Sequence, residues 1–444
     1  MRIQSKIYLI TKNSSNLTYQ FYNESVKKCK WSHIYENIIF TFDNCCFGYS
    51  CKGGAQEITT LEVWEDVSKA SAIGKAVSDF EAMYNCQVKI REIDAINQLG
   101  ALREHIKDKS SIPDVMILVS DKMGEAVKDG LLSPLDFMDT DRDQYMDSAV
   151  GVFADGGKFY AAPRSVESLV VYYNQDMIEY PLETLSEYEK NAKENKKQGK
   201  LGLIGKFDDI YYAYGFIRGY GGYIFGKNPD GSLNVHDIGI DSEKAMKGLE
   251  ELTDYIKSSI PQDIFEKNGD ALIDTLFMKG KASAVINGPW ALEKYAKAGV
   301  NIGIAPLPKL KNGQRLAPFY GVKGYAVPEK AQNKILAAKL IEFLNQPEYA
   351  EDRYFKKAEL PPIKKLMDES FIEYDELANA MINEINMLDP MPSVDKMNEV
   401  WGDLNYALNR SIVYGIPYKS TFKNAKIRIE KMNSENELAS LNFQ

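Results

Sequence analysis

TLFMKGKASAVINGPW, residues Thr275–Trp290, is the stretch that indicates the fold most clearly. Its first residues are typical of a helix end, and Lys279–Gly280 would stop that helix. An uncharged strand at Ala282–Ile286 follows and ends in the turn Asn287–Pro289, which places Trp290 just beyond the strand. Open α/β sheets bind ligands at the carboxyl ends of their strands. We therefore expect Trp290 to face a ligand rather than the core, since tryptophan is rarely buried completely.

The amino-terminal half alternates short apolar segments with amphipathic ones. Thr59–Trp64, Val88–Ile93 and Val115–Val119 are predicted strands. Between them, Val67–Tyr84 has apolar residues three or four positions apart, which predicts a helix with one buried face. Ile96–Lys107 is a second predicted helix. Strands and helices in this order predict a doubly wound α/β unit.

A second unit begins beyond Gly156. Residues 157–164 are predicted to form a strand that Pro163 stops, and Leu169–Tyr173 is predicted to be another buried strand. Arg164–Ser168, between them, is the simplest place for the chain to cross from one unit to the other. The length of 444 residues is in keeping with two domains.

Composition argues against several functional classes. The net charge is −9 and the Lys and Arg residues are scattered, whereas a nucleic-acid-binding protein presents a basic face. The three histidines are not clustered, which leaves little room for a His-based metal site or a Ser-His pair. Beyond the first 50 residues, no apolar run approaches the ~20 residues of a membrane span. We expect no metal, no cofactor and no nucleic-acid partner.

Residues 1–56 differ from the rest and are predicted to be a degenerate or wrongly assigned signal segment and tether. Lys27, Lys28 and Lys30 would be its basic start, but Glu36 and Asn37 interrupt the apolar core at 34–42. The sequence Gly48–Cys51 is similar to the cleavage box of bacterial lipoproteins, so Cys51 is a candidate lipid anchor. A wrong start of the reading frame and a plain tail are alternatives. The only cysteine after Cys51 is Cys86, so the remaining chain cannot form an internal disulfide.

Two kinds of side chain gather at the predicted strand ends. Flat rings stack on the C–H faces of sugars, and charged groups make the stronger hydrogen bonds to sugar hydroxyls. For any single acid, a solvated loop charge or a helix cap, such as Asp66 before the first helix, is the plainer interpretation. The aromatic candidates are Trp64, Tyr211, Trp290 and, on a helix, Trp401. The polar candidates are Asp66, Lys69, Asp121, Glu167 and Asp209.

Six stretches resemble the maltose/maltodextrin-binding proteins of bacterial ABC importers. They are VWEDVSK (63–69), PDVMILVSDKMG (113–124), SVESLVVYYNQDM (165–177), YGFIRGYGGYIFG (214–226), FMKGKASAVINGPWALEKY (277–295) and MPSVDKMNEVW (391–401). The resemblance implies a two-lobe α/β, periplasmic-binding-protein-like fold with a hinge and a ligand cleft between the lobes. It also implies lobes at 57–165 plus 324–371 and at 166–323 plus 372–444. The family implies no catalysis, and delivery of the sugar to a membrane permease.

The resemblance carries over unevenly at the sugar-binding positions. Trp64, Asp66, Lys69, Asp121, Glu167, Tyr211, Trp290 and Trp401 match positions that contact sugar in that family. Six residues differ from the family pattern. Ser68 replaces an Asp, Leu118 a stacking Trp and Lys122 an Arg. Ile210 replaces a Pro, Gly402 a Tyr and Asn405 an Arg. Asp209 replaces a Glu. The aromatic floor is thus retained, while several hydrogen-bonding positions are changed.

We therefore expect an extracytoplasmic, monomeric sugar-binding protein of an ABC importer, lipid-anchored or periplasmic, with maltose or maltodextrins as ligands. A different oligosaccharide is the first alternative. A glycoside hydrolase that uses Glu167 is an alternative from another class. The pairs Tyr172-Tyr173 and Tyr211-Tyr212 leave a ferric site as a weaker alternative.

Overall fold

The computed structural model describes residues 58–265, 269–385 and 388–441. Residues 57–444 form one compact unit. The predictions for residues 1–56, including Cys51 as a lipid anchor, lie outside the described residues. No helix in the described part of the chain is long and apolar enough to cross a membrane.

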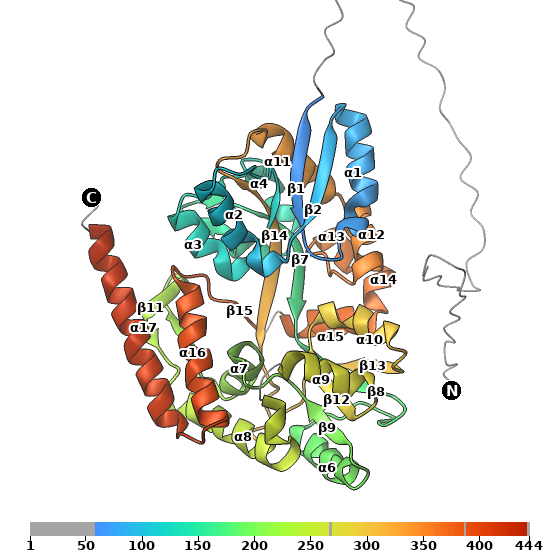
Figure 1. Ribbon diagram of the computed structural model, residues 1–444, viewed down its shortest axis with the longest axis vertical. Coiled ribbons are helices and arrows are strands. Elements are labelled where there is room, and N and C mark those ends of the chain that lie inside the picture. Colours follow the sequence, from blue (N-terminus) through green and yellow to red (C-terminus); the bar gives the residue numbers. More distant parts are fainter. Residues whose placement is uncertain (1–57, 266–268, 386–387, 442–444) are drawn as a thin grey trace, which may run out of the picture. The chain divides into compact units, whose positions relative to one another are not determined.

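The first lobe is built on a sheet that contains both parallel and antiparallel strands (Figure 1). Strand β1 (Thr60–Glu65) runs parallel to β2 (Gln87–Glu92), and a bridge from Val63 to Val115 joins β1 to the start of β3 (Met116–Val119). The long strand β14 (Phe319–Pro328) runs antiparallel to β3, to β4 (Leu132–Ser133) and to β7 (Ala162–Ser168). Helices α1 (Ala70–Tyr84), α2 (Gln98–Lys107), α11 (Lys334–Leu344) and α12 (Pro347–Lys357) pack around this sheet.

The second lobe has a four-stranded sheet in the order β13-β8-β12-β9. These strands are β13 (Ile302–Ala305), β8 (Val170–Asn174), β12 (Ala282–Asn287) and β9 (Leu201–Ile204). Every residue of β12 is buried, because its uncharged sequence is covered on both faces. The helices of this lobe include α6 (Leu185–Lys196), α7 (Ile210–Gly219), α8 (Glu243–Ser259), α9 (Gly269–Met278), α10 (Leu292–Lys297) and α15 (Glu376–Ile385). The hairpin of β10 (Phe225–Lys227) and β11 (Leu233–Ile238), with α16 (Met397–Ile412) and α17 (Tyr418–Leu441), packs beside α7 and α8.

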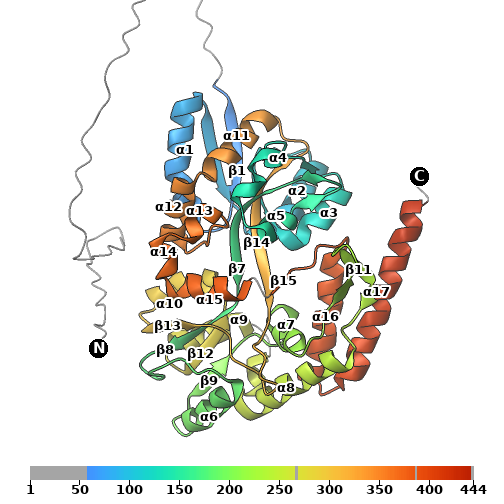
Figure 2. The same ribbon diagram turned by 180° about the vertical axis from the view of Figure 1, so that it is seen from behind.

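The paired strands β7 and β14 connect the two lobes and lie side by side in both views (Figures 1 and 2). Only Leu169 separates β7 from β8 of the other sheet. At this same end of the pair, β14 pairs through Phe319 and Tyr320 with β15 (Asp389–Pro390). A third passage runs from α14 (Ser370–Glu373) to α15. The lobe boundaries given above stay a prediction.

One strand prediction is wrong. Pro163 does not stop a strand at 157–164 but lies inside β7, while residues 158 and 159 form the separate short strand β6 (Lys158–Phe159). The ladder between β7 and β14 is irregular at this point, because Lys323 pairs with Ser165 whereas Gly324 pairs with Pro163. Arg164 is therefore the extra residue of a bulge. Proline has no N–H to donate, so a bulge is where a strand tolerates it.

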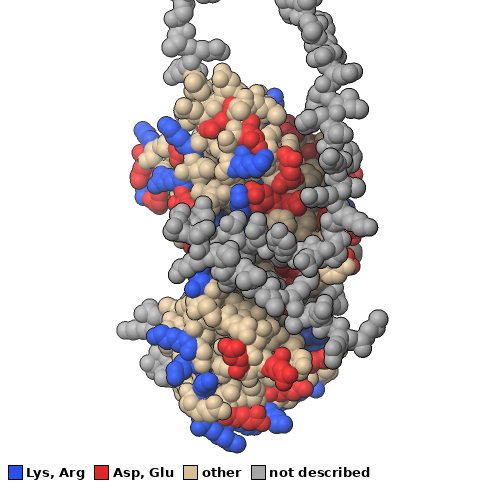
Figure 3. Space-filling model, turned by 90° about the vertical axis from the view of Figure 1, so that its right-hand side faces the viewer, with Lys and Arg blue, Asp and Glu red and all other residues tan. Residues whose placement is uncertain are grey.

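The remaining described elements are short. They are α3 (Met123–Lys128), α4 (Met138–Asp141), α5 (Asp147–Gly151), α13 (Lys364–Met367) and β5 (Ala154–Asp155), with single turns of 3-10 helix between several elements. On the part of the surface visible in Figure 3, Lys and Arg side chains are interspersed with Asp and Glu. This mixture follows from the scattered charges of the sequence.

Candidate functional site

Trp290 lies in the turn that follows β12, as the strand pattern predicts. The turn is a single 3-10 helical turn, Pro289–Ala291, and the Trp290 side chain is 39% exposed. Its indole lies directly over Gly288, where a Cβ atom would approach the ring to 2.2 Å. The hydroxyl of buried Tyr172 donates to the Gly288 carbonyl at 3.0 Å and holds the turn from below. The glycine thus lets the ring lie flat against the backbone, with its other face open.

Tyr211 contributes a second ring beside Trp290, but from a helix rather than from a strand end. It lies in the first turn of α7, and its ring centroid is 6.3 Å from that of Trp290. Asp209 is the N-cap of α7 and accepts a hydrogen bond from the Tyr211 amide at 2.9 Å. Burial, together with the charges of Glu167, Asp209 and Asp121, raises the pKa of the Tyr211 phenol well above its ordinary value. Carboxylates from both lobes therefore converge near this ring.

Trp401 joins the two lobes through a hydrogen bond. It lies on α16, and its indole Nε1 donates to Asp121 Oδ2 at 3.0 Å. Asp121 follows β3 of the first lobe and is nearly buried. The Trp401 ring also contacts Phe319 at the start of β14, with ring centroids 5.7 Å apart. A predicted stacking ring of one lobe thus contacts a predicted hydroxyl acceptor of the other.

Asp66 is occupied on both of its oxygens. Oδ1 accepts from the amides of Val67 and Ala95 at 3.0 and 3.1 Å, and Oδ2 is 3.3 Å from the ammonium groups of both Lys69 and Lys323. A carboxylate has about four lone-pair positions. Against the effect of burial, Lys323 and Lys69 lower the pKa of Asp66. These contacts make Asp66 an anchor for two lysines, although the sequence predicted a ligand.

Glu167 keeps an oxygen available. It lies on β7, and its Oε2 is 3.4 Å from Lys323 Nζ. No described residue donates a hydrogen bond to its other oxygen, Oε1. Glu167 lines a pocket at the hinge. The residues that line this pocket are Lys69, Ser165, Val166, Glu167, Pro289, Trp290, Lys357, Ala358 and Glu359. This pocket brings together residues that the sequence separates by up to 290 positions.

Below the pocket lies a buried ion network that the sequence analysis missed. Arg164 is 1% exposed; it contacts Glu65, and its NH2 nitrogen donates to Glu359 Oε2 at 2.7 Å. Although burial opposes it, the cations Arg164, Lys69 and Lys323 lower the pKa of Glu359. Burial instead raises the pKa of Glu65, which has only Arg164 as a close cation. The signal in the sequence was weak: Glu65 and Arg164 lie in strands β1 and β7 beside further charges, and Glu359 lies outside any strand.

Trp64 is a wrong prediction as a sugar contact. It lies within β1 rather than after it, and no part of its side chain is exposed. Its indole N–H donates to Glu62 at 2.9 Å, and its ring meets the His105 ring edge-on with centroids 4.9 Å apart. Both polar and apolar parts of Trp64 are thus satisfied within the first lobe.

No metal site is evident. Among the described residues, no group of three or more His, Cys, Asp or Glu side chains is placed to hold a metal ion. Tyr172, one of the residues behind the ferric alternative, is buried and donates its hydroxyl to the Gly288 carbonyl. The site therefore consists of exposed Trp290, the half-buried rings of Tyr211 and Trp401, carboxylates and paired lysines.

Comparison with known proteins identifies the family. Residues 75–380 match the bacterial extracellular solute-binding proteins. The chain belongs to this family. Its relatives include the galactooligosaccharide-binding protein of Bacillus subtilis (strain 168), 37% identical over 78% of this chain and 83% of the relative. The maltooligosaccharide ABC transporter solute-binding lipoprotein of Streptococcus pneumoniae (strain ATCC BAA-255 / R6) is 30% identical over 78% and 82%. The structure of MalX from Streptococcus pneumoniae in complex with maltopentaose has a TM-score of 0.76 and 28% identity, covering 84% of this chain and 100% of MalX.

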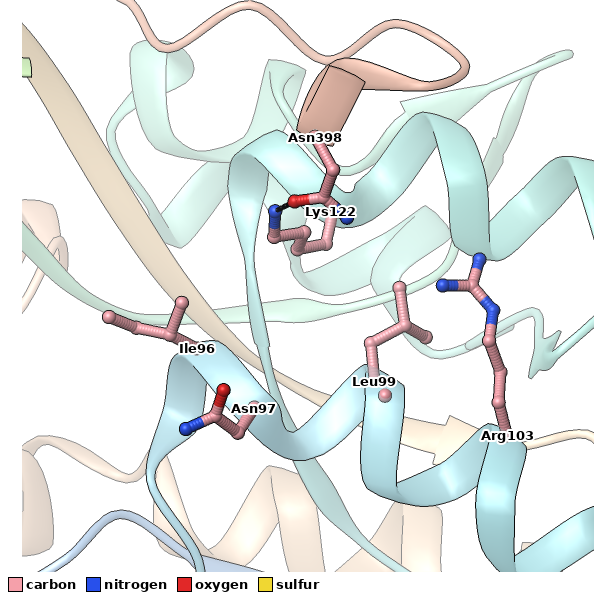
Figure 4. Close-up of a pocket in the computed structure, with 7 residues that line it drawn as sticks. Ile96, Asn97, Leu99, Arg103, Lys122 and Asn398 are labelled. Carbon is pink, nitrogen blue, oxygen red and sulfur yellow. Dashed lines mark hydrogen bonds between the residues drawn. The ribbon is translucent and has the colours of Figure 1, made fainter. Parts of the chain in front are cut away.

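In this solute-binding protein, Lys122 is held by neighbouring side chains. Its ammonium contacts Asn398 Oδ1 at the start of α16 (Figure 4). The same ammonium lies 3.4 Å from Asp121 Oδ2. Asn398 in turn donates to Glu125 of α3. The Gly124 amide donates to Ser393 Oγ at 2.9 Å, and a Cβ atom on Gly124 would lie only 2.9 Å from the Val394 carbonyl carbon. The first lobe thus contacts the segment before α16 closely.

The side chains at two other positions that differ from the family pattern also make contacts within the protein. Asn405 Oδ1 accepts a hydrogen bond from the Ile210 amide at 2.7 Å and so helps to cap α7. Leu118 is buried within β3 and adds no ring to the site. Polar groups that could reach a ligand are therefore fewer than the residue types alone suggest.

Proposed function

We propose that this solute-binding protein holds a neutral oligosaccharide between its lobes and delivers it to the membrane permease of an ABC importer. The observation that carries the proposal is the placement of exposed Trp290 and half-buried Tyr211 beside carboxylates contributed by both lobes. Rings accept the apolar faces of a sugar, and carboxylates accept its hydroxyl groups. The lysines near the site are already paired with acids, which disfavours an anionic ligand.

Each side chain has a separate role in this proposal. Trp290, Tyr211 and Trp401 stack against the sugar rings. Glu167 and Asp121 accept hydrogen bonds from sugar hydroxyl groups. Each carboxylate retains lone pairs beyond those that face Lys323 and Trp401, respectively. Asp66, Lys69 and Asp209 hold the surrounding loops and complete the polar rim.

Galacto-oligosaccharides are the favoured ligand class, ahead of the maltodextrins that the sequence resemblance suggests. Identity to the galactooligosaccharide-binding relative is 37%, against 30% for the maltooligosaccharide-binding one. The structure supports this order, because Lys122, Asn405 and Leu118 are turned to internal contacts at positions that differ from the maltodextrin pattern. Maltodextrins stay the second candidate, supported by the likeness to MalX with maltopentaose.

Binding without catalysis is part of the proposal. The lobes would close around the sugar through the β7–β14 connection, and the ligand would select the closed state. A hydrolase would require a carboxylic acid that donates a proton to the leaving group, whereas Glu167 lies beside an ammonium group. Absence of reducing-sugar release on long incubation with either oligosaccharide class checks this point, and release that is lost in Glu167→Gln would contradict it.

We also propose an extracytoplasmic, monomeric protein, anchored by lipid through Cys51 or held in the periplasm. The family of extracellular solute-binding proteins and the lipoprotein named among the relatives support this location. Metabolic labelling of the full chain with a palmitate analogue tests it. Label lost in Cys51→Ala supports the anchor, and unlabelled wild-type protein contradicts it.

Replacement of Trp290 by Ala is expected to weaken oligosaccharide binding by at least ~1.4 kcal/mol, a factor of about ten, because one ring face of the sugar loses its partner. The measurement is calorimetric titration of the full chain with galactotriose, maltotriose and maltopentaose. Tyr180→Ala is the matched control, because Tyr180 is 72% exposed and lies away from the site. Equal affinity of the Trp290→Ala and wild-type proteins would contradict the stacking role.

A further inference from the structure

Lys323 is a charged residue in the middle of a buried connecting strand. It lies on β14, whose residues are all buried, and is itself 8% exposed. Lysine is almost never buried without a partner. In the ladder with β7, Gly321 lies opposite Glu167 and Lys323 opposite Ser165. Lys323 and Glu167 are therefore diagonal neighbours on one face of the paired strands.

The Lys323 ammonium bridges two carboxylates that belong to different segments. Nζ is 3.3 Å from Asp66 Oδ2, in the loop after β1, and 3.4 Å from Glu167 Oε2 on β7. The Glu167 side chain crosses over Gly321, where a Cβ atom would be in ordinary van der Waals contact with Glu167 Cγ at 3.5 Å. Asp66 is itself held by two amides and Lys69. Asp66 is therefore the fixed end of the bridge, and Glu167, which keeps one oxygen available, is the free end.

The charges around Lys323 keep it protonated. Burial alone would lower the pKa of Lys323, but the acids that surround it raise it. The charged groups that face it from the packed elements are Asp66, Glu167, Glu359 and Arg164. The chain thus maintains an ammonium group next to the oxygen pair of Glu167.

We propose that Lys323 is a positioning residue for the ligand: anchored by Asp66, it binds Glu167 Oε2 and thereby directs Glu167 Oε1 toward a sugar hydroxyl. The inference rests on the proposed function, because it assumes that a sugar occupies the cleft. It assigns to Lys323, on the connecting strand β14, a role in the affinity for the oligosaccharide. It also gives Asp66, whose own oxygens are engaged, a role in holding Lys323.

The test compares Lys323→Met, which keeps the length and removes the charge, with Lys323→Arg, which keeps the charge. Full-length proteins are titrated with galactotriose and maltotriose at pH 5, 6, 7 and 8. We expect Lys323→Met to weaken binding at least tenfold throughout this pH range, because Asp66 and Glu167 lose the ammonium group that bridges them. Lys323→Arg should recover most of the affinity. Lys75→Met, which removes a 60% exposed lysine side chain paired with Asp79, should bind like the wild type.

Unfolding of the sugar-free proteins by urea at pH 3 and pH 7 provides a readout that does not depend on the ligand. In the wild type, Lys323 and Lys69 lower the pKa of Asp66, so Asp66 contributes stability above its ordinary value of 3.8 that is lost as the pH falls. Lys323→Met removes part of this contribution, so the variant should be destabilised more at pH 7 than at pH 3. Wild-type protein that binds none of the sugars would remove the proposed function, and equal destabilisation at both pH values would then overturn the inference. If the wild type binds, an equal loss of affinity in both Lys323 variants, or affinity within threefold of wild type in Lys323→Met, overturns it.

Discussion

Replacement of Arg164 by Met is expected to lower the free energy of unfolding by about 3 to 5 kcal/mol, the largest effect predicted for this chain. The Arg164 side chain is fully buried and contacts Glu65 and Glu359, which are buried as well. Methionine fills much of the space but leaves two carboxylates without their shared cation. Removal of one partner from a buried pair leaves a charge that neither water nor protein compensates.

Urea unfolding of the full chain, followed by far-UV circular dichroism, measures this loss at pH 7. Arg142→Met is the matched control, because the Arg142 side chain is 55% exposed and its contact with Asp143 is 3.7 Å long. Exposed pairs contribute little, so the control should unfold within about 0.5 kcal/mol of the wild type. A loss below about 1 kcal/mol in Arg164→Met would show that the network does not stabilise the hinge.

The Arg164 effect should also depend on pH. In the wild type, the pKa of Glu359 is lowered, so this residue contributes stability above the ordinary value of 4.5 and loses it as the pH falls. Arg164→Met removes the strongest of the charges that lower this pKa. The difference between variant and wild type is therefore expected to be largest at neutral pH and to shrink below about pH 4.5.

Trp401→Ala is expected to weaken oligosaccharide binding by about 2 to 4 kcal/mol, roughly 30-fold to 700-fold. The substitution removes a stacking ring, and it removes the Nε1 donor that reaches Asp121 from the other lobe at 3.0 Å. A ring contact is worth about 0.5 to 1.5 kcal/mol beyond its buried area, and a hydrogen bond to a charged group about 1.5 to 3 kcal/mol. Loss of the bond between lobes also makes the closed state less favourable.

Calorimetry with galactotriose and maltotriose measures the affinity of Trp401→Ala, with Trp401→Phe beside it. Phenylalanine keeps a ring but cannot donate to Asp121, so the Phe variant should lie between the wild type and the Ala variant. Tyr406→Ala is the control on the same helix, because Tyr406 is 59% exposed. Equal binding by the Phe and wild-type proteins would remove the hydrogen bond from the explanation, and equal binding by the Ala protein would remove Trp401 from the site.

Much of the local structure could be predicted from the sequence, because it depends on neighbours along the chain. The uncharged run before Asn287 is strand β12, and Trp290 lies exposed just after it. Apolar spacing also identified the buried face of α1.

The tertiary structure decided which of these residues meet and which are already occupied. Trp64 is a residue type that often contacts sugar, yet here its side chain lies in the core. Its indole N–H donates to Glu62, and its ring packs against His105, which is distant in the sequence. Pro163 could remain within a strand only because the register with β14 slips there. The sequence by itself thus determined the family, most of the helices and strands, and the position of Trp290 just after β12. The buried network of Arg164, Lys323 and Glu359 required the folded chain, because the pairing of charges depends on distances between segments that local sequence does not contain.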